Sequence, residues 1–166
     1  MIALTLLVLG ASSTVSALLG VSSLNRDSEE RSRAHESIQN MIEAMQAEEF
    51  SEVFARFNAT AADDPVGGSS PGTSFAATAL AARAGDADGL PGEIVFPGGG
   101  LVLREDGVDR EAGMPRDLNG DGLIDLADHA GDYTILPMRV RVRWRGARGE
   151  QELEFAVTLS NDKNAP

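Results

Sequence analysis

The sequence predicts an α+β protein in which a long N-terminal helix packs on a small antiparallel β-sheet. Two observations predict this architecture. Residues 2–24 carry no charge and continue into a segment of helical periodicity, and two C-terminal runs alternate apolar with polar residues. With 166 residues, the chain is long enough for one modest head beside the helix. We expect three parts: an apolar helix half over 1–24, an amphipathic half over 25–57 and a globular β head over 58–166.

The apolar helix half is long enough to cross a membrane. At about 1.5 Å per residue, segment 2–24 would reach roughly 34 Å, against about 30 Å for the apolar core of a bilayer. A secretory signal cleaved near Ser16 or Ala17 is an alternative, but no Lys or Arg precedes Arg26 and the run is too long. Small residues would let neighbouring helices approach closely. They are Gly10, Ala11, Ser12, Ser13, Ala17 and Gly20.

The amphipathic half keeps one apolar face. Apolar residues between Ala34 and Met45 recur at spacings of three and four, with charged residues on the opposite face. If the helix continued without a break, the apolar residues of segment 50–57 would lie on a different face from that stripe. This change of phase predicts a bend, or a new short helix capped by Ser51.

The rest of the chain predicts loops and hairpins. Segment 58–72 is rich in Ala, Asp, Pro, Gly and Ser, which is typical of a loop, and segment 75–83 fits either a short helix or more loop. Segments 93–96 and 101–104 flank Pro97 and three glycines, which predicts a hairpin. The strongest strand signals are 138–145 and 153–159. A turn at 146–149 would pair Arg145 with Glu150, Arg143 with Glu152, Arg141 with Glu154, Val142 with Leu153, Val140 with Phe155 and Met138 with Val157.

Composition excludes several classes of function. The net charge of -12 and the pI near 4.5 argue against a nucleic-acid partner, since phosphates are bound by clustered Lys and Arg. The arginines of segment 139–145 are better explained by acidic partners on the next strand. The absence of cysteine excludes disulfides and thiol chemistry.

One segment carries recognisable chemistry, the acidic loop 117–128. Calcium takes about six to eight oxygen ligands, and a loop of about 12 residues supplies them from positions 1, 3, 5, 7, 9 and 12, with glycine at 6. The segment matches this pattern, although an Asp/Asn/Gly-rich turn with accidental spacing is the alternative. The predicted Ca²⁺ ligands are the side chains of Asp117, Asn119 and Asp121, the carbonyl of Leu123, Asp125 directly or through water, and the closing Asp128.

The loop resembles the calcium loops of dockerin modules, in which aspartate also stands at the closing position, but a second copy is absent. We therefore expect one structural calcium site between two hairpins, with Ile124 packed inward. His35 and His129 are expected at the surface. Since no nucleophile and base pair is apparent, we expect no enzyme.

The opening Met-Ile-Ala-Leu-Thr-Leu-Leu-Val-Leu-Gly, the amphipathic continuation and the Met-Arg-Val-Arg-Val-Arg-Trp strand at 138–144 together resemble type IV pilin-like proteins. The nearer resemblance is to minor pilins and the minor pseudopilins of type II secretion. It implies a filament subunit with a single-pass inner-membrane anchor and a periplasmic head, whose partners are other pilin or pseudopilin subunits bound through the N-terminal helix. The family's basic leader, Gly-Phe cleavage point and nearby glutamate have no counterpart here, so we expect the first mature residues to be missing. The alternative function is a signal-anchored extracytoplasmic domain with calcium-dependent binding.

Overall fold

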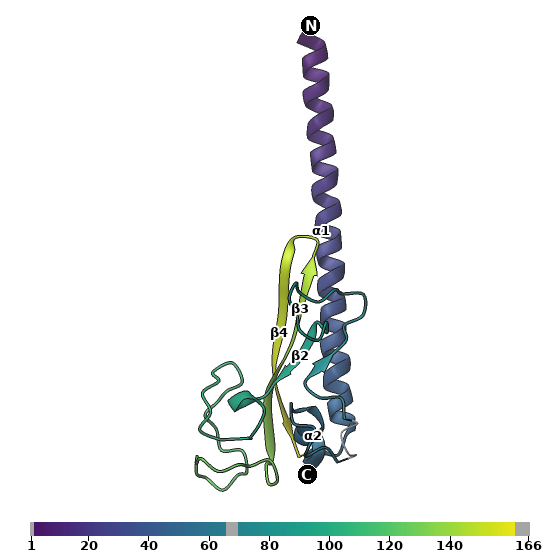
Figure 1. Ribbon diagram of the computed structural model, residues 1–166. Coiled ribbons are helices and arrows are strands. Elements are labelled where there is room, and N and C mark those ends of the chain that lie inside the picture. The colour runs from purple at the N-terminus through teal and green to yellow at the C-terminus, as the bar shows by residue number, and fades with distance from the viewer. Residues whose placement is uncertain (1, 66–69, 162–166) are drawn as a thin grey trace.

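The computed structural model describes residues 2–65 and 70–161, with side chains described from residue 20 onward. Helix α1 (Ile2–Ala47) is followed by α2 (Phe50–Phe57) and four strands. These are β1 (Ser74–Phe75), β2 (Gly92–Val95), β3 (Ile135–Gly146) and β4 (Gly149–Ser160), with the short 3-10 turn η1 (Pro97–Gly99) after β2. Figure 1 shows α1 as one rod whose second half lies against the sheet while the first half projects beyond the head.

The four strands form one antiparallel sheet in the order β1-β2-β3-β4. The predicted α+β class, with a long helix on an antiparallel sheet, is confirmed. The predicted pairing of the last two strands is also confirmed, residue for residue, from Arg145 opposite Glu150 to Met138 opposite Val157. Both faces of this hairpin specify the same register, because a shift by one residue would turn every apolar side chain to the wet face.

The arginines of β3 do not all take the predicted partners. Arg141 reaches its predicted partner Glu154 at 3.9 Å, but its closest partner is Glu93 of β2, at 2.8 Å. Arg143, predicted to pair with Glu152, binds Glu93 at 2.7 Å. Arg139 binds Asp109 at 2.9 Å and Glu154 at 3.1 Å. The reason is that β3 is an inner strand, so its polar face meets carboxylates from β2 and a loop as well as from β4.

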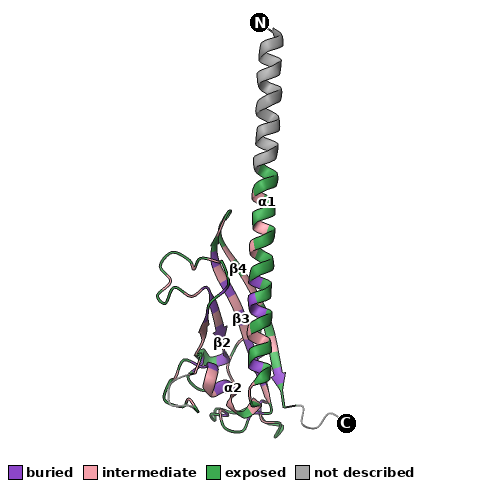
Figure 2. Cartoon of the chain, turned by 90° about the vertical axis from the view of Figure 1, so that its right-hand side faces the viewer, coloured by how far each residue is buried: buried purple, intermediate pink, exposed green. Residues whose placement is uncertain are grey.

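The core lies between α1 and the inner face of the sheet. Ala34, Ile38 and Met45 of α1 are completely buried, as is Trp144 near the end of β3. Figure 2 shows the buried stretches of α1 in the half of the helix that runs along the sheet. Burying one such large apolar side chain stabilises a fold by about 1.5–3 kcal/mol. The helical stripe and the alternating strand face therefore meet, as their periodicities predict.

The chain turns sharply after α1, and a new short helix follows. The predicted break in the helix is confirmed, but Glu49 occupies the N-cap position of α2 and makes no side-chain cap. Ser51 lies inside α2, so the predicted cap is wrong. The start of α2 is held instead by Tyr133, whose hydroxyl accepts a hydrogen bond from the Phe54 N–H at 3.2 Å and donates one to the Phe50 carbonyl.

The predicted hairpin of segments 93–96 and 101–104 is wrong, because only the first segment forms a strand, β2. Three consecutive glycines at 98–100 have φ of 75°, 88° and 75°, a left-handed run that takes the chain out of the sheet. Strand β2 pairs with β1 and β3. Segment 101–134 is consequently a long excursion without regular secondary structure, and the acidic loop lies within it.

Helix α1 leaves the head at a polar clamp formed by Glu30. The Glu30 carboxylate accepts hydrogen bonds from the Trp144 indole at 3.3 Å and from the Ala147 N–H at 3.1 Å in the β3–β4 turn. On the next residue, Arg31 donates to the Gln151 side chain at 2.9 Å. These contacts fix where the helix and the hairpin separate.

The predicted membrane-spanning half over 1–24 lies mostly outside the described side chains, which begin at residue 20. Within the described part of the chain, no helix combines the length and the apolar character that crossing a bilayer requires. Two apolar residues of α1 can be placed just beyond the head: Val21 is 56% exposed and Leu24 is 55% exposed.

Candidate metal centre

The first half of the acidic loop folds into a tight succession of turns held by its own side chains. The Asp117 carboxylate accepts hydrogen bonds from the Gly120 N–H at 2.6 Å and the Gly122 N–H at 2.8 Å. Asn119 and Asp121 each accept from the backbone N–H two residues further on, at 3.0 and 2.8 Å. Positive φ values of 84° at Gly120 and 87° at Gly122 let the backbone curl around these oxygens.

The second half of the loop turns toward other parts of the head. Asp128 accepts hydrogen bonds from the Leu103 N–H at 3.0 Å and the Ala130 N–H at 3.1 Å, so the predicted closing carboxylate ties the loop to segment 101–104. Ile124 is 53% exposed, and its predicted inward packing is wrong. The side chain of Leu123, whose carbonyl is a predicted ligand, is also exposed, and its N–H donates to Asp121.

Beneath the loop lies a buried carboxylate, Glu105, which is only 1% exposed. One oxygen, Oε1, accepts hydrogen bonds from the Leu118 N–H at 2.7 Å and the Asn119 N–H at 3.4 Å, and Oε2 accepts from the Asp125 N–H at 3.1 Å. Burying a charge in this way is tolerated only with such compensation. Glu105 therefore acts as an anchor that connects both halves of the loop.

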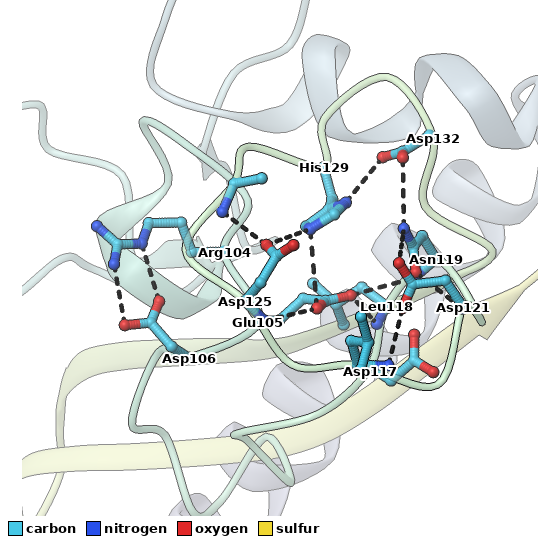
Figure 3. Close-up of polar contacts among 12 residues, drawn as sticks. Arg104, Glu105, Asp106, Asp117, Leu118, Asn119, Asp121, Asp125, His129 and Asp132 are labelled. Carbon is cyan, nitrogen blue, oxygen red and sulfur yellow. Dashed lines mark hydrogen bonds and ion pairs between the residues drawn. The ribbon is translucent and has the colours of Figure 1, made fainter.

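His129 is the second buried polar residue here, 4% exposed, so its predicted surface position is wrong. Its Nε2 lies 3.1 Å from Asp125 Oδ1 and 3.7 Å from Glu105 Oε2, and its Nδ1 lies 3.0 Å from Asp132 Oδ1 (Figure 3). The same Asp125 oxygen accepts the Ala127 N–H at 2.7 Å. The imidazole is thus held between carboxylates on both of its nitrogens.

Glu105, Asp125 and His129 form a group that could hold a metal ion, since one ligand atom from each lies within 4.8 Å of the others. Of the six predicted calcium ligands, this group contains Asp125 alone. The structure places Asp117, Asn119 and Asp121 together in the first turn, and Asp128 against Leu103. The side-chain amide of Asn119 connects the first turn to the segment after the loop, because it lies 3.4 Å from Asp121 and 3.5 Å from Asp132.

The electrostatics of the group favour the protonated, positively charged form of the His129 imidazole. Burial by itself lowers the pKa of His129, but hydrogen bonds with Asp125 and Asp132 and the charge of Glu105 outweigh it and raise that pKa above its ordinary value. The Ala127 N–H and His129 together lower the pKa of Asp125. Both shifts stabilise the charged forms.

Glu105, His129 and Asp132 are absent from the predicted ligand set. Asp125, His129 and Asp132 stand at i, i+4 and i+7, a spacing that gathers side chains on one face only in a helix, and this segment is not helical, so spacing alone could not have identified the cluster. Glu105 lies 20 residues before Asp125 in an unremarkable segment, and only the folded excursion brings the two together.

No protein-family model, curated protein or solved structure matches this chain.

Proposed function

We propose that this chain is a non-enzymatic structural subunit of a type IV pilus or of a type II secretion pseudopilus, held in the inner membrane by the first half of α1 before assembly. The observation that carries the proposal is the continuation of α1 as a single helix well beyond the head (Figure 1). The resemblance of the opening residues and of the β3 segment to minor pilins and minor pseudopilins supports the same assignment.

The difference between the two halves of α1 supports this role. Its second half is committed to the head through Ala34, Ile38 and Met45, whereas Val21 and Leu24 are exposed beyond the head. Residues 2–24 contain no charge. Such a helix needs apolar surroundings, which lipid and the helices of other subunits both supply. A subunit whose helix exchanges contacts with lipid for contacts with the helices of other subunits can pass from a membrane into a filament.

Cysteine cross-linking tests the assembly role, because the chain has no cysteine of its own. In full-length protein reconstituted into phospholipid vesicles, we expect Leu24→Cys to give disulfide-linked dimers under mild oxidation. The matched control Glu152→Cys, at an exposed position of β4, should stay monomeric. Dimers from the control alone, or from neither variant, would contradict helix-mediated assembly.

We further propose that Ca²⁺ braces the head at loop 117–128. The loop contains four aspartates and no basic residue. Its first turn already orients oxygens of Asp117, Asn119 and Asp121 around glycines of positive φ. Calcium is bound by such sets of carboxylate and amide oxygens.

Chelation tests the calcium brace. EGTA should lower the thermal midpoint of the full chain, and Asp117→Asn should abolish the difference between calcium and EGTA. If EGTA leaves melting unchanged and calorimetry detects no calcium binding, the segment is an ordinary turn.

A further inference from the structure

We infer that Glu105, Asp125 and His129 form a binding site for Zn²⁺ or a similar transition metal, distinct in chemistry from the calcium loop above it. The site offers one imidazole nitrogen and two carboxylate oxygens. Calcium selects oxygen ligands, whereas imidazole is a preferred ligand of zinc. This inference rests on the cluster around His129 and not on the proposed filament role or on calcium binding.

Two of the three distances between ligand atoms are close to those of a tetrahedral ion. Zinc bonds of about 2.0–2.2 Å place neighbouring ligand atoms of a tetrahedron about 3.3–3.6 Å apart. His129 Nε2 lies 3.1 Å from Asp125 Oδ1 and 3.7 Å from Glu105 Oε2, values on either side of that range. The oxygens of Asp125 and Glu105 lie within 4.8 Å of each other, so these two carboxylates would close around the ion to complete three corners of a tetrahedron.

The imidazole needs a cation where Nε2 faces the two carboxylates. A neutral imidazole has a single N–H, so it can donate to Asp132 from Nδ1 or to Asp125 from Nε2, but not to both. Either a second proton or a metal ion on Nε2 satisfies every contact at once, and in both cases Nδ1 keeps its hydrogen for Asp132. The pairing of a ligating histidine with a carboxylate on its other nitrogen is the usual support of zinc sites.

The charge balance also favours a divalent ion. Glu105, Asp125 and Asp132 contribute three negative charges around one imidazole. Within the described ranges, no ion pair joins a Lys or Arg to any of these carboxylates. A proton on His129 offsets one of the three charges, and a divalent metal offsets two.

Backbone N–H groups already hold the carboxylate ligand atoms in place. Glu105 Oε2 accepts the Asp125 N–H, and Asp125 Oδ1 accepts the Ala127 N–H. Glu105 and His129 are almost fully buried, whereas the side chain of Asp125 is 49% exposed. The site therefore has two buried ligands and one that faces solvent.

Calorimetric titration of the full chain with Zn²⁺, in detergent and in saturating Ca²⁺, tests the inference. We expect one zinc site, lost in His129→Asn and kept in His35→Asn, which removes the only other histidine. Asp132→Asn should weaken binding by about 10- to 100-fold, as the loss of an orienting partner does. Asp117→Asn should keep zinc binding while it loses calcium binding.

The histidine nitrogen spectrum of the wild-type chain gives an independent readout that does not depend on the folding of any variant. With only two histidines, zinc should move the Nε2 resonance of one and leave the other unchanged. The site is overturned if the wild-type chain binds no zinc, or if His129→Asn still binds it. It is also overturned if Asp117→Asn or His35→Asn loses zinc binding while His129→Asn keeps it.

Discussion

Glu105→Gln is expected to destabilise the metal-free head far more than the loss of one charge at its surface would. The two carboxylate oxygens of Glu105 accept three backbone N–H groups, from Leu118, Asn119 and Asp125. A glutamine offers one oxygen and one NH₂ group. Whichever way the amide is turned, a donor then faces a backbone donor at a position that is 1% exposed.

The magnitude follows from those contacts. A buried N–H left without an acceptor costs about 1–3 kcal/mol, and replacing a charged acceptor with a neutral one at the remaining contacts costs about 1 kcal/mol more. We therefore expect the free energy of unfolding to fall by about 2–4 kcal/mol. The neighbouring Asp106→Asn is the matched control, because Asp106 pairs with Arg104 at the surface, where such a pair contributes about 0–1 kcal/mol.

The assay is urea unfolding of the full chain in detergent with a chelator present. The fluorescence of Trp144 reports it, because this residue is the only tryptophan and is fully buried in the head. Glu105→Gln should lower the urea midpoint without changing the slope, which would show lost stability in an unchanged unfolding unit. If Glu105→Gln and Asp106→Asn lower the midpoint equally, Glu105 does not anchor the loop.

Three further changes probe other parts of the head. Glu30→Ala leaves the buried indole N–H of β3 without its acceptor and should cost about 1–3 kcal/mol in thermal or urea unfolding; an unchanged midpoint would show that the clamp is dispensable. A hydrogen bond from Ser74, together with backbone donors, holds the pKa of Asp88 at about 2. This pKa is below the ordinary aspartate value of about 3.9. The ionised Asp88 therefore stabilises the folded state above about pH 3.9, and this stabilisation is lost as the pH falls toward 2. Asp88→Asn should flatten this acid dependence of the thermal midpoint, and an equally steep loss in the variant would refute the assignment. Gly92→Ala should cost about 1–3 kcal/mol, because its new methyl group would overlap the Phe75 ring; wild-type stability would show that the ring moves aside freely.

The hairpin of β3 and β4 could be predicted because its information is local. Apolar and charged residues alternate along both strands, and one register satisfies both faces. The sequence could not indicate that Glu93 would take Arg141 and Arg143, because that pairing depends on which strand lies on the other side of β3. Local pattern specified the register, and the order of strands in space specified the ion pairs.

The candidate site was only half predictable, for the same reason. Asp117, Asn119 and Asp121 shape their own turn through neighbours two to five residues away, so spacing alone identifies them. Burial of Glu105 and His129 depends on segment 101–105 folding under the loop, and that segment looked like a strand. Three glycines of positive φ prevented the strand and placed the carboxylate below the acidic residues.

The way α1 joins the head also has a mechanical consequence. Figure 1 shows the two long strands running alongside the helix, with their turn at the point where α1 emerges. A pull along the helix axis would load the Glu30 clamp, the Arg31–Gln151 contact and the buried stripe around Ile38 in shear, so that they resist together. A pull across the axis would open the clamp first and the stripe afterwards. The joint should therefore withstand tension along the rod much better than bending away from it.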